Sequence, residues 1–120
     1  MKSINETLIK YVNEIGNNKE FWKVNKKKIG SNNIRELAVL ALNADCYEEF
    51  KLFIQYKTAK GNGWDSYFNA EKKERFGDVI MSYLDKIYEA SNRCDKEALN
   101  NISRFFGYLY WRKRIIGGKQ

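Results

Sequence analysis

The chain has 120 residues, of which 22 are Lys or Arg and 15 are Asp or Glu, so its formal charge is +7. This length predicts a single domain over residues 1–120 that buries a modest core without metal or disulfide bonds. The chain has no histidine, which excludes Ser-His and Cys-His nucleophile pairs and imidazole metal ligands. The excess of positive charge favours nucleic acid or another acidic partner.

Several features predict where the protein resides. No apolar run approaches the ~20 residues that span a bilayer, and Glu6 and Glu14 interrupt the N-terminal segment where a signal peptide would have its apolar core. The two cysteines, Cys46 and Cys94, lack metal-ligand spacing. We expect both to be small, semi-buried residues in a reducing compartment. The sequence therefore predicts a cytoplasmic protein with no membrane contact.

Proline is absent and apolar residues recur at helical spacing. This pattern predicts an all-α, single-domain helix bundle of about five helices. The first helix is expected from Ser3, which forms a capping-box pattern with Glu6, to Gly16. The segment Asn18–Lys28 is expected to be either a short helix or a basic loop.

The central helices follow a break in the chain. The Gly30–Asn33 segment is typical of a helix start, and the helix that follows is expected to end near Asn43. Asp45 and Glu48 form a second capping-box pattern. We expect the next helix to run from there to Lys60.

The last third of the chain predicts a connection and two helices. Trp64–Ala70 is expected to be a connecting segment, with Trp64 packed against the bundle. Glu71–Ser91 is expected to form a long helix. Gly77 inside that helix indicates either a close helix contact or a break. Asp95 is expected to cap the final helix, which Gly117–Gly118 would end. Its inner face is predicted to consist of four apolar residues: Leu99, Ile102, Phe106 and Leu109.

Positive charge is concentrated in two clusters. Residues 19–35 contain a single acid, Glu20, and six cations: Lys19, Lys23, Lys26, Lys27, Lys28 and Arg35. Residues 104–120 contain no acid and five cations: Arg104, Arg112, Lys113, Arg114 and Lys119. The run of three lysines at 26–28 is more typical of a solvated turn. As a site, it would attract phosphates regardless of sequence.

The last helix also carries aromatic residues on its outer side. Arg104, Tyr108, Trp111 and Ile115 recur at helical spacing, on the face away from the predicted inner residues. Two interpretations remain open. Tyr108 and Trp111 are either interface anchors, for instance against a second copy of the chain, or part of a base-stacking and phosphate-binding surface.

Catalytic chemistry is poorly supported. The carboxylates nearest in sequence, Asp45 with Glu48 and Glu71 with Glu74, are best interpreted as helix caps and solvated surface. A two-metal nuclease needs several converging acids, so a nuclease site at Asp45 and Glu48 is the least favoured alternative. No phosphate-binding loop or dinucleotide motif is present. We expect a non-enzymatic protein without cofactor or metal.

Three segments resemble a known family. Ile29–Arg35 contains a short polar cap that leads into an Ile-Arg pair, and Phe50–Lys60 contains an aromatic-apolar run followed by Tyr and a small-basic pair. Arg104–Lys119 is rich in aromatics and closes with basic residues, two isoleucines and Gly-Gly. These segments are similar to the small helical subunit of type III-A CRISPR effector complexes.

This resemblance implies a non-catalytic subunit of a ribonucleoprotein complex in antiviral defence. Such a subunit lies along guide RNA and target RNA, beside copies of itself and other effector subunits, and binds the RNA backbone without reading sequence. By position, the resemblance makes six residues candidate phosphate contacts: Arg35, Lys57, Lys60, Arg112, Lys113 and Arg114. Arg104 joins them as a nucleic-acid-binding candidate because of its place on the outer face. The alternative is a homo-oligomeric helical interaction module or adaptor without nucleic-acid binding.

Overall fold

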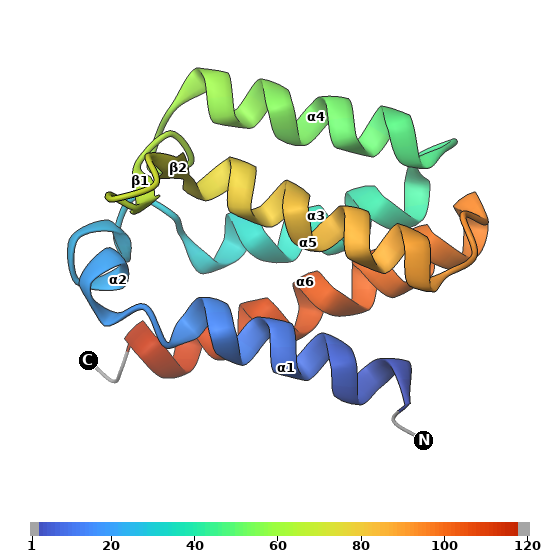
Figure 1. Ribbon diagram of the computed structural model, residues 1–120, viewed down its shortest axis with the longest axis horizontal. Helices are drawn as coiled ribbons and strands as arrows, with labels where there is room; N and C mark the ends of the chain where they lie inside the picture. Colours follow the sequence, from blue (N-terminus) through green and yellow to red (C-terminus); the bar gives the residue numbers. More distant parts are fainter. Residues whose placement is uncertain (1–2, 118–120) are drawn as a thin grey trace.

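The structure is a computed structural model that describes residues 3–117 (Figure 1). These residues form six helices and one two-stranded sheet, which confirms an all-α bundle with one helix more than the sequence predicted. The elements are α1 (Ile4–Gly16), α2 (Lys19–Asn25), α3 (Ser31–Asn43), α4 (Tyr47–Lys60), β1 (Tyr67–Asn69), β2 (Glu74–Arg75), α5 (Phe76–Ala90) and α6 (Asp95–Gly117). Within residues 3–117, no helix has the length and apolar character needed to cross a bilayer.

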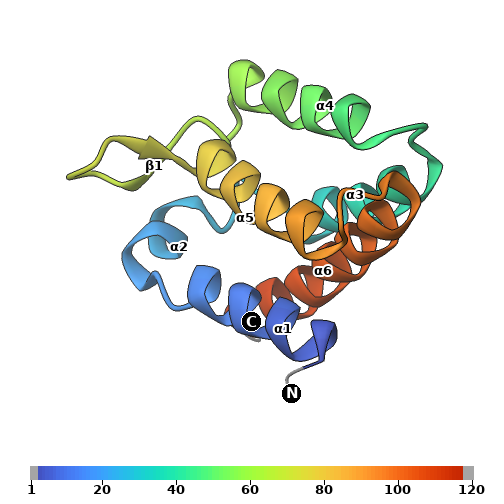
Figure 2. The same ribbon diagram turned by 45° about the vertical axis from the view of Figure 1, so that its right-hand side comes forward.

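Helix α6 is the centre of the bundle. It packs against α1, α3 and α5, whereas α4 packs mainly on α5 (Figures 1 and 2). The predicted inner face of α6 is buried, and so is its neighbour Phe105, which has no exposed surface. A helix with neighbours on several sides buries more than one narrow stripe, which is why Phe105 lies in the core. Gly118, expected to end this helix with Gly117, lies outside the described residues.

The N-terminal helices begin at polar caps. In α1, the Ser3 hydroxyl accepts a hydrogen bond from the Glu6 N–H (3.2 Å) and the Glu6 carboxylate accepts one from the Ser3 N–H (3.1 Å), which confirms the capping box. In α2, the Asn18 side chain accepts from the Phe21 N–H at 3.1 Å. The segment after Gly16 is therefore a short helix rather than a basic loop.

The predicted capping box at the start of α4 is wrong. Cys46 occupies the N-cap position, and its side chain makes no capping hydrogen bond. The backbone N–H of Tyr47 donates instead to the carboxylate of Asp95 at 3.0 Å. Asp95, which the sequence predicted as the cap of α6, is the first residue of that helix. Its carboxylate supplies a cap to α4. A donor at the start of a helix needs a partner, and here a distant residue provides it.

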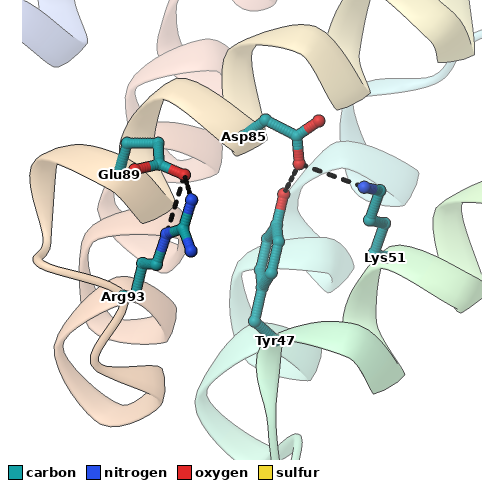
Figure 3. Close-up of polar contacts among 5 residues, drawn as sticks. All are labelled: Tyr47, Lys51, Asp85, Glu89 and Arg93. Atoms are coloured by element: carbon teal, nitrogen blue, oxygen red, sulfur yellow. Dashed lines mark hydrogen bonds and ion pairs between the residues drawn. The ribbon is translucent and has the colours of Figure 1, made fainter.

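Polar contacts attach the start of α4 to α5 (Figure 3). The Tyr47 hydroxyl donates to the Asp85 carboxylate, and Lys51 Nζ lies 3.2 Å from the same oxygen. Nearby, an Arg93 guanidinium nitrogen lies 2.8 Å from the Glu89 carboxylate. Asp85 thereby joins α5 to α4, whereas the Glu89–Arg93 pair is local to the end of α5.

The predicted long helix over Glu71–Ser91 begins only at Phe76. The residues before it form an antiparallel hairpin in which Tyr67 pairs with Arg75. Lys73 has a φ of 54°, a left-handed turn conformation that no helix continues through. The hairpin lies beside α2 at one end of the bundle (Figures 1 and 2).

Gly77 permits a close contact between α5 and α4, which is one of its two predicted roles. A methyl group at this position would lie 1.7 Å from the Thr58 hydroxyl oxygen. The Gly77 N–H donates to the Trp64 carbonyl at 2.9 Å. Trp64 is buried, as predicted, and its ring lies 4.9 Å from Phe76, which in turn lies 5.0 Å from Phe21 of α2. This aromatic cluster fixes α2 against the start of α5.

The cysteine prediction is correct for one residue and wrong for the other. Cys46 is half-buried, but Cys94 is exposed. Cys94 lies in the turn between α5 and α6, where the chain crosses the surface.

Candidate nucleic-acid interface

Cations from both basic clusters of the sequence lie at the same end of the molecule, but Arg104 does not, because it contacts Asn5 at the start of α1. The end of α1, the whole of α2, the start of α3 and the ends of α4 and α6 all gather there, at the left of Figure 1. This end therefore collects residues that are far apart in the chain.

A pocket of about 380 Å³ lies where α2 meets the ends of α1 and α6. Its lining includes four cationic side chains and no acid: Lys19, Lys23, Lys26 and Arg112. The remaining lining residues are polar or apolar: Gly16, Asn17, Trp22, Ile115 and Ile116. We call this site the basic pocket. Positive charge around an apolar floor suits an anion that also carries an apolar or aromatic part.

The sequence of α2 explains why its lysines share the pocket. Lys19, Lys23 and Lys26 recur at helical spacing and so project from one side of the helix. Trp22 lies on the same side and lines the pocket from below the lysines, because it is buried and its indole N–H donates to the Ile15 carbonyl at 3.0 Å. This bond also satisfies a carbonyl near the end of α1. A helix of one to two turns is thereby held in place.

Arg112 reaches the pocket from α6 and is weakly engaged by the protein. Its Nη2 donates to the Asn17 side-chain oxygen across 3.5 Å, and its Nε is buried without a hydrogen-bond partner. Arginine binds phosphate through several N–H groups in a planar fork. The guanidinium thus retains donors for an incoming anion.

The last residue of α1 allows a test of the Arg112 position. A methyl group at Gly16 would lie 2.7 Å from Arg112 Nε and 2.8 Å from Arg112 Cγ. We expect Gly16→Ala to push this side chain out of the pocket and to weaken single-stranded RNA binding about 5-fold, the loss of one charge-assisted contact. The melting temperature should change little because Ala favours the helix. Equal binding by both proteins in fluorescence anisotropy would remove Arg112 from the interface.

Lys113 stands next to Arg112 but is buried, with 5% of its surface exposed. Burial lowers the pKa of its ammonium group, and the charges of Lys26 and Arg114 lower it further. Lys113 therefore adds positive potential beside the basic pocket but presents little surface for direct contact. Besides burial, the like charges of Lys26 and Arg114 act on this ammonium group, which places three cations near one another at this end.

The lowered pKa of Lys113 predicts how stability depends on pH. In the unfolded chain this lysine titrates near 10.5, and in the folded protein it loses its proton at a lower pH. Between these two pKa values the unfolded chain binds more protons than the folded protein. The free energy of unfolding therefore rises with pH in that range. We expect Lys113→Met to be more stable than the wild type at pH 7, with the difference shrinking as the pH approaches 10.5. Urea denaturation at pH 7 and pH 10 checks this. A difference that stays constant or grows with pH would contradict it.

Three other predicted contacts lie outside the pocket lining. The Arg35 guanidinium lies over the Tyr110 ring, 5.3 Å from its centroid. Arg104 is exposed and donates to the Asn5 side chain at 2.9 Å. Arg114 is exposed beside Lys113. Arg35 and Arg104 thus engage neighbouring side chains, whereas Arg114 adds charge near the pocket.

Lys57 and Lys60 form a separate patch at the end of α4. Lys57 Nζ lies 5.4 Å from the Trp64 ring centroid, and Lys60 Nζ lies 5.6 Å from that of Tyr56. Burial lowers the pKa of Lys57, and the charge of Lys60 adds to this effect, while Glu36 opposes it. The two lysines therefore contribute positive potential at the same end without lining the basic pocket.

The outer face of α6 is as predicted. Trp111 and Ile115 are 63% and 67% exposed, and Tyr108 is half-buried with its ring 5.7 Å from that of Trp111. Ile115 also lines the basic pocket, so this aromatic face continues into it. Lys119 lies outside the described residues.

The described part of the chain contains no group of three or more His, Cys, Asp and Glu side chains placed to hold a metal ion. No protein-family model, curated protein or solved structure matches this chain. The site must therefore be interpreted from its own chemistry.

Sequence reasoning identified Arg112 as a site residue but did not assign the three pocket lysines of α2 to the site. Their helical spacing was visible in the sequence. What the sequence lacked was the position of α2 against the end of α6.

Proposed function

We propose that this protein binds the phosphate backbone of single-stranded RNA through the basic pocket, without sequence specificity and without catalysing a reaction. The observation that carries the proposal is a pocket lined by four cations and no acid. Like charges repel one another, and a polyanion that replaces its own counterions with these side chains relieves the repulsion.

A simpler explanation accounts for only part of this charge. Cations near helix C-termini are stabilised by the helix dipole, which applies to Lys23 in the last turn of α2 and, outside the pocket, to Arg114 in α6 and to Lys57 and Lys60 in α4. It does not explain Lys19, which lines the pocket from the N-terminal end of α2, where the helix dipole disfavours a cation. Phosphate binding accounts for both groups.

The wider role that we propose follows the resemblance described above. The protein would be a small subunit of a cytoplasmic type III CRISPR effector complex that holds guide RNA and target RNA while other subunits perform cleavage. The exposed Trp111 and Ile115 would then lie beside the bound strand, where an aromatic ring offers a stacking surface. Arg35, Lys57 and Lys60 would extend the positive surface along it.

The salt dependence of binding tests this function. Each phosphate neutralised on a single strand contributes a slope of about −0.7 to a plot of log K against log salt. Four pocket cations predict a slope of roughly −3 for unstructured ten-nucleotide RNAs of different sequence. Anisotropy between 50 and 300 mM salt measures it. Absence of binding, or a slope near zero, would end the proposal.

A second function is favoured by apolar side chains on the outer surface of α3 and α4. Val39, Leu42, Leu52 and Tyr56 are all more than half exposed. Exposed apolar groups of this size are typical of protein interfaces. The second candidate is therefore a homo-oligomeric interaction module or adaptor, with Tyr108 and Trp111 as further anchors.

Light scattering distinguishes the two functions. An interaction module forms a stable oligomer without nucleic acid, and Trp111→Ala or Leu52→Glu reduces its mass to that of the monomer. A monomer that binds RNA with the expected salt dependence excludes the second candidate as the primary function.

A further inference from the structure

A second hollow lies on the other side of α2. It is a groove of about 770 Å³ between α2 and the β1–β2 hairpin. Lys23 lines both this groove and the basic pocket, so the two sites adjoin across α2. Figures 1 and 2 both place α2 between the hairpin and the end of α6.

The walls of the groove are fixed by hydrogen bonds. The Asn18 amide nitrogen donates to the Phe68 carbonyl at 2.7 Å, and the Ser66 hydroxyl donates to the Asn25 side-chain oxygen at 3.0 Å. Both bonds run from the hairpin segment to α2. The groove is therefore already formed in the free protein, which reduces the entropic cost of binding.

Two exposed apolar side chains, Tyr67 and Val24, line this groove, with 48% and 67% of their surfaces exposed. The Arg75 guanidinium lies over the Tyr67 ring, 5.3 Å from its centroid, and donates to the Asp65 carbonyl at 2.7 Å. Arg75 thus holds the ring in position while much of it remains exposed. A fixed, exposed aromatic ring in a groove is a stacking platform for a flat ligand.

The charge of the groove differs from that of the basic pocket. Glu20 and Lys23 are its charged lining residues. A carboxylate repels phosphate, but it accepts hydrogen bonds from amino groups such as those on the edges of nucleobases. The groove thus favours an uncharged, flat group, and the pocket across α2 favours an anion.

We infer that the groove takes an unpaired nucleobase of the strand whose phosphates occupy the basic pocket, with Tyr67 as the stacking residue. This inference rests on the proposed function and adds to it a preference for strands with exposed bases. Stacking on an aromatic ring tolerates any base, so binding remains independent of sequence.

The test compares strands with equal charge. A fluorescein-labelled ten-nucleotide RNA and an abasic strand with the same number of phosphates are titrated by anisotropy at one salt concentration. We expect the RNA to bind at least roughly 10-fold more tightly, a typical effect of one or two stacked bases. Equal affinity would overturn the inference and leave phosphate binding intact. Failure of both strands to bind would overturn the proposed function and the inference with it.

Variants of Tyr67 locate the effect. Tyr67→Ser should reduce the difference between the two strands to less than roughly 3-fold, while Tyr67→Phe, which keeps the ring, should preserve it. Neither variant should alter binding of the abasic strand. If Tyr67→Ser proves folded by circular dichroism and still prefers the base-bearing strand as strongly as the wild type, the groove is not the base site. If Tyr67→Ser fails to fold, Trp111→Ala tests the other exposed ring: loss of the preference for the base-bearing strand in that variant would place the bases on α6 and overturn the inference, whereas a retained preference supports the groove.

Discussion

Reversal of two lysine charges in the basic pocket should weaken single-stranded RNA binding by about 100-fold at 50 mM salt. Lys23 and Lys26 are exposed and line the pocket, so Lys23→Glu with Lys26→Glu removes two cations and adds two repulsive charges. Phosphate contacts supply most of the affinity in sequence-independent binding, which makes this loss large. Anisotropy titrations of the same ten-nucleotide RNA measure it.

A matched variant separates a local effect from a change in net charge. Lys10 and Lys96 are also exposed but do not line the basic pocket. Replacing both with Glu changes the net charge by the same amount, so long-range attraction is reduced equally. We expect this control to lose less than roughly 5-fold in affinity. Equal losses in both variants would mean that RNA senses only the total charge of the protein.

The largest effect on stability is expected from Gly77→Ala. The added methyl group would lie 1.7 Å from the Thr58 hydroxyl oxygen and 2.8 Å from Thr58 Cβ, so α4 and α5 must move apart. Overpacking of this kind costs about 3 kcal/mol, which corresponds to a fall in melting temperature of roughly 12 °C for a domain of this size. Thermal and urea denaturation followed by circular dichroism measure the change.

Two further variants establish the cause of that loss. Thr58→Ala removes the closest atom but leaves Cβ, so the double variant should recover part of the stability lost by Gly77→Ala alone. Gly107→Ala is the matched control, because a methyl group there meets no atom within 4 Å. It should be neutral or slightly stabilising, since Ala is the better helix former. A Gly77→Ala protein as stable as Gly107→Ala would refute the close contact.

The helices could be predicted from local sequence patterns, and the hairpin could not. The Ser3 capping box and the spacing of Leu8, Val12 and Ile15 are local features that tertiary packing leaves unchanged. The two strands are only three and two residues long, and the turn between them has a single turn-forming residue, Asn69, whose side chain accepts from the Lys72 N–H at 3.2 Å. Their pairing depends on packing between the hairpin segment and α2, which no local pattern records.

The candidate site was predictable as chemistry but not as geometry. Two basic clusters are visible in the sequence, yet Lys23 and Arg112 come together only because α2 packs against the end of α6. Burial of Lys113 follows from the same packing. The cap that Asp95 supplies to Tyr47 is a further case of a partner that sequence spacing cannot reveal.

The most direct measurement is a two-dimensional ¹H–¹⁵N nuclear magnetic resonance titration of the labelled protein with a ten-nucleotide RNA. If the basic pocket holds the strand, the largest shifts will occur at Gly16, Asn17, Lys23, Lys26 and Arg112. The amides of Tyr47, at the start of α4, and of Arg93, in the turn between α5 and α6, should not change, because these segments lie at the opposite end of the bundle (Figure 1). Shifts concentrated at that opposite end, with the pocket amides unaffected, would contradict the account.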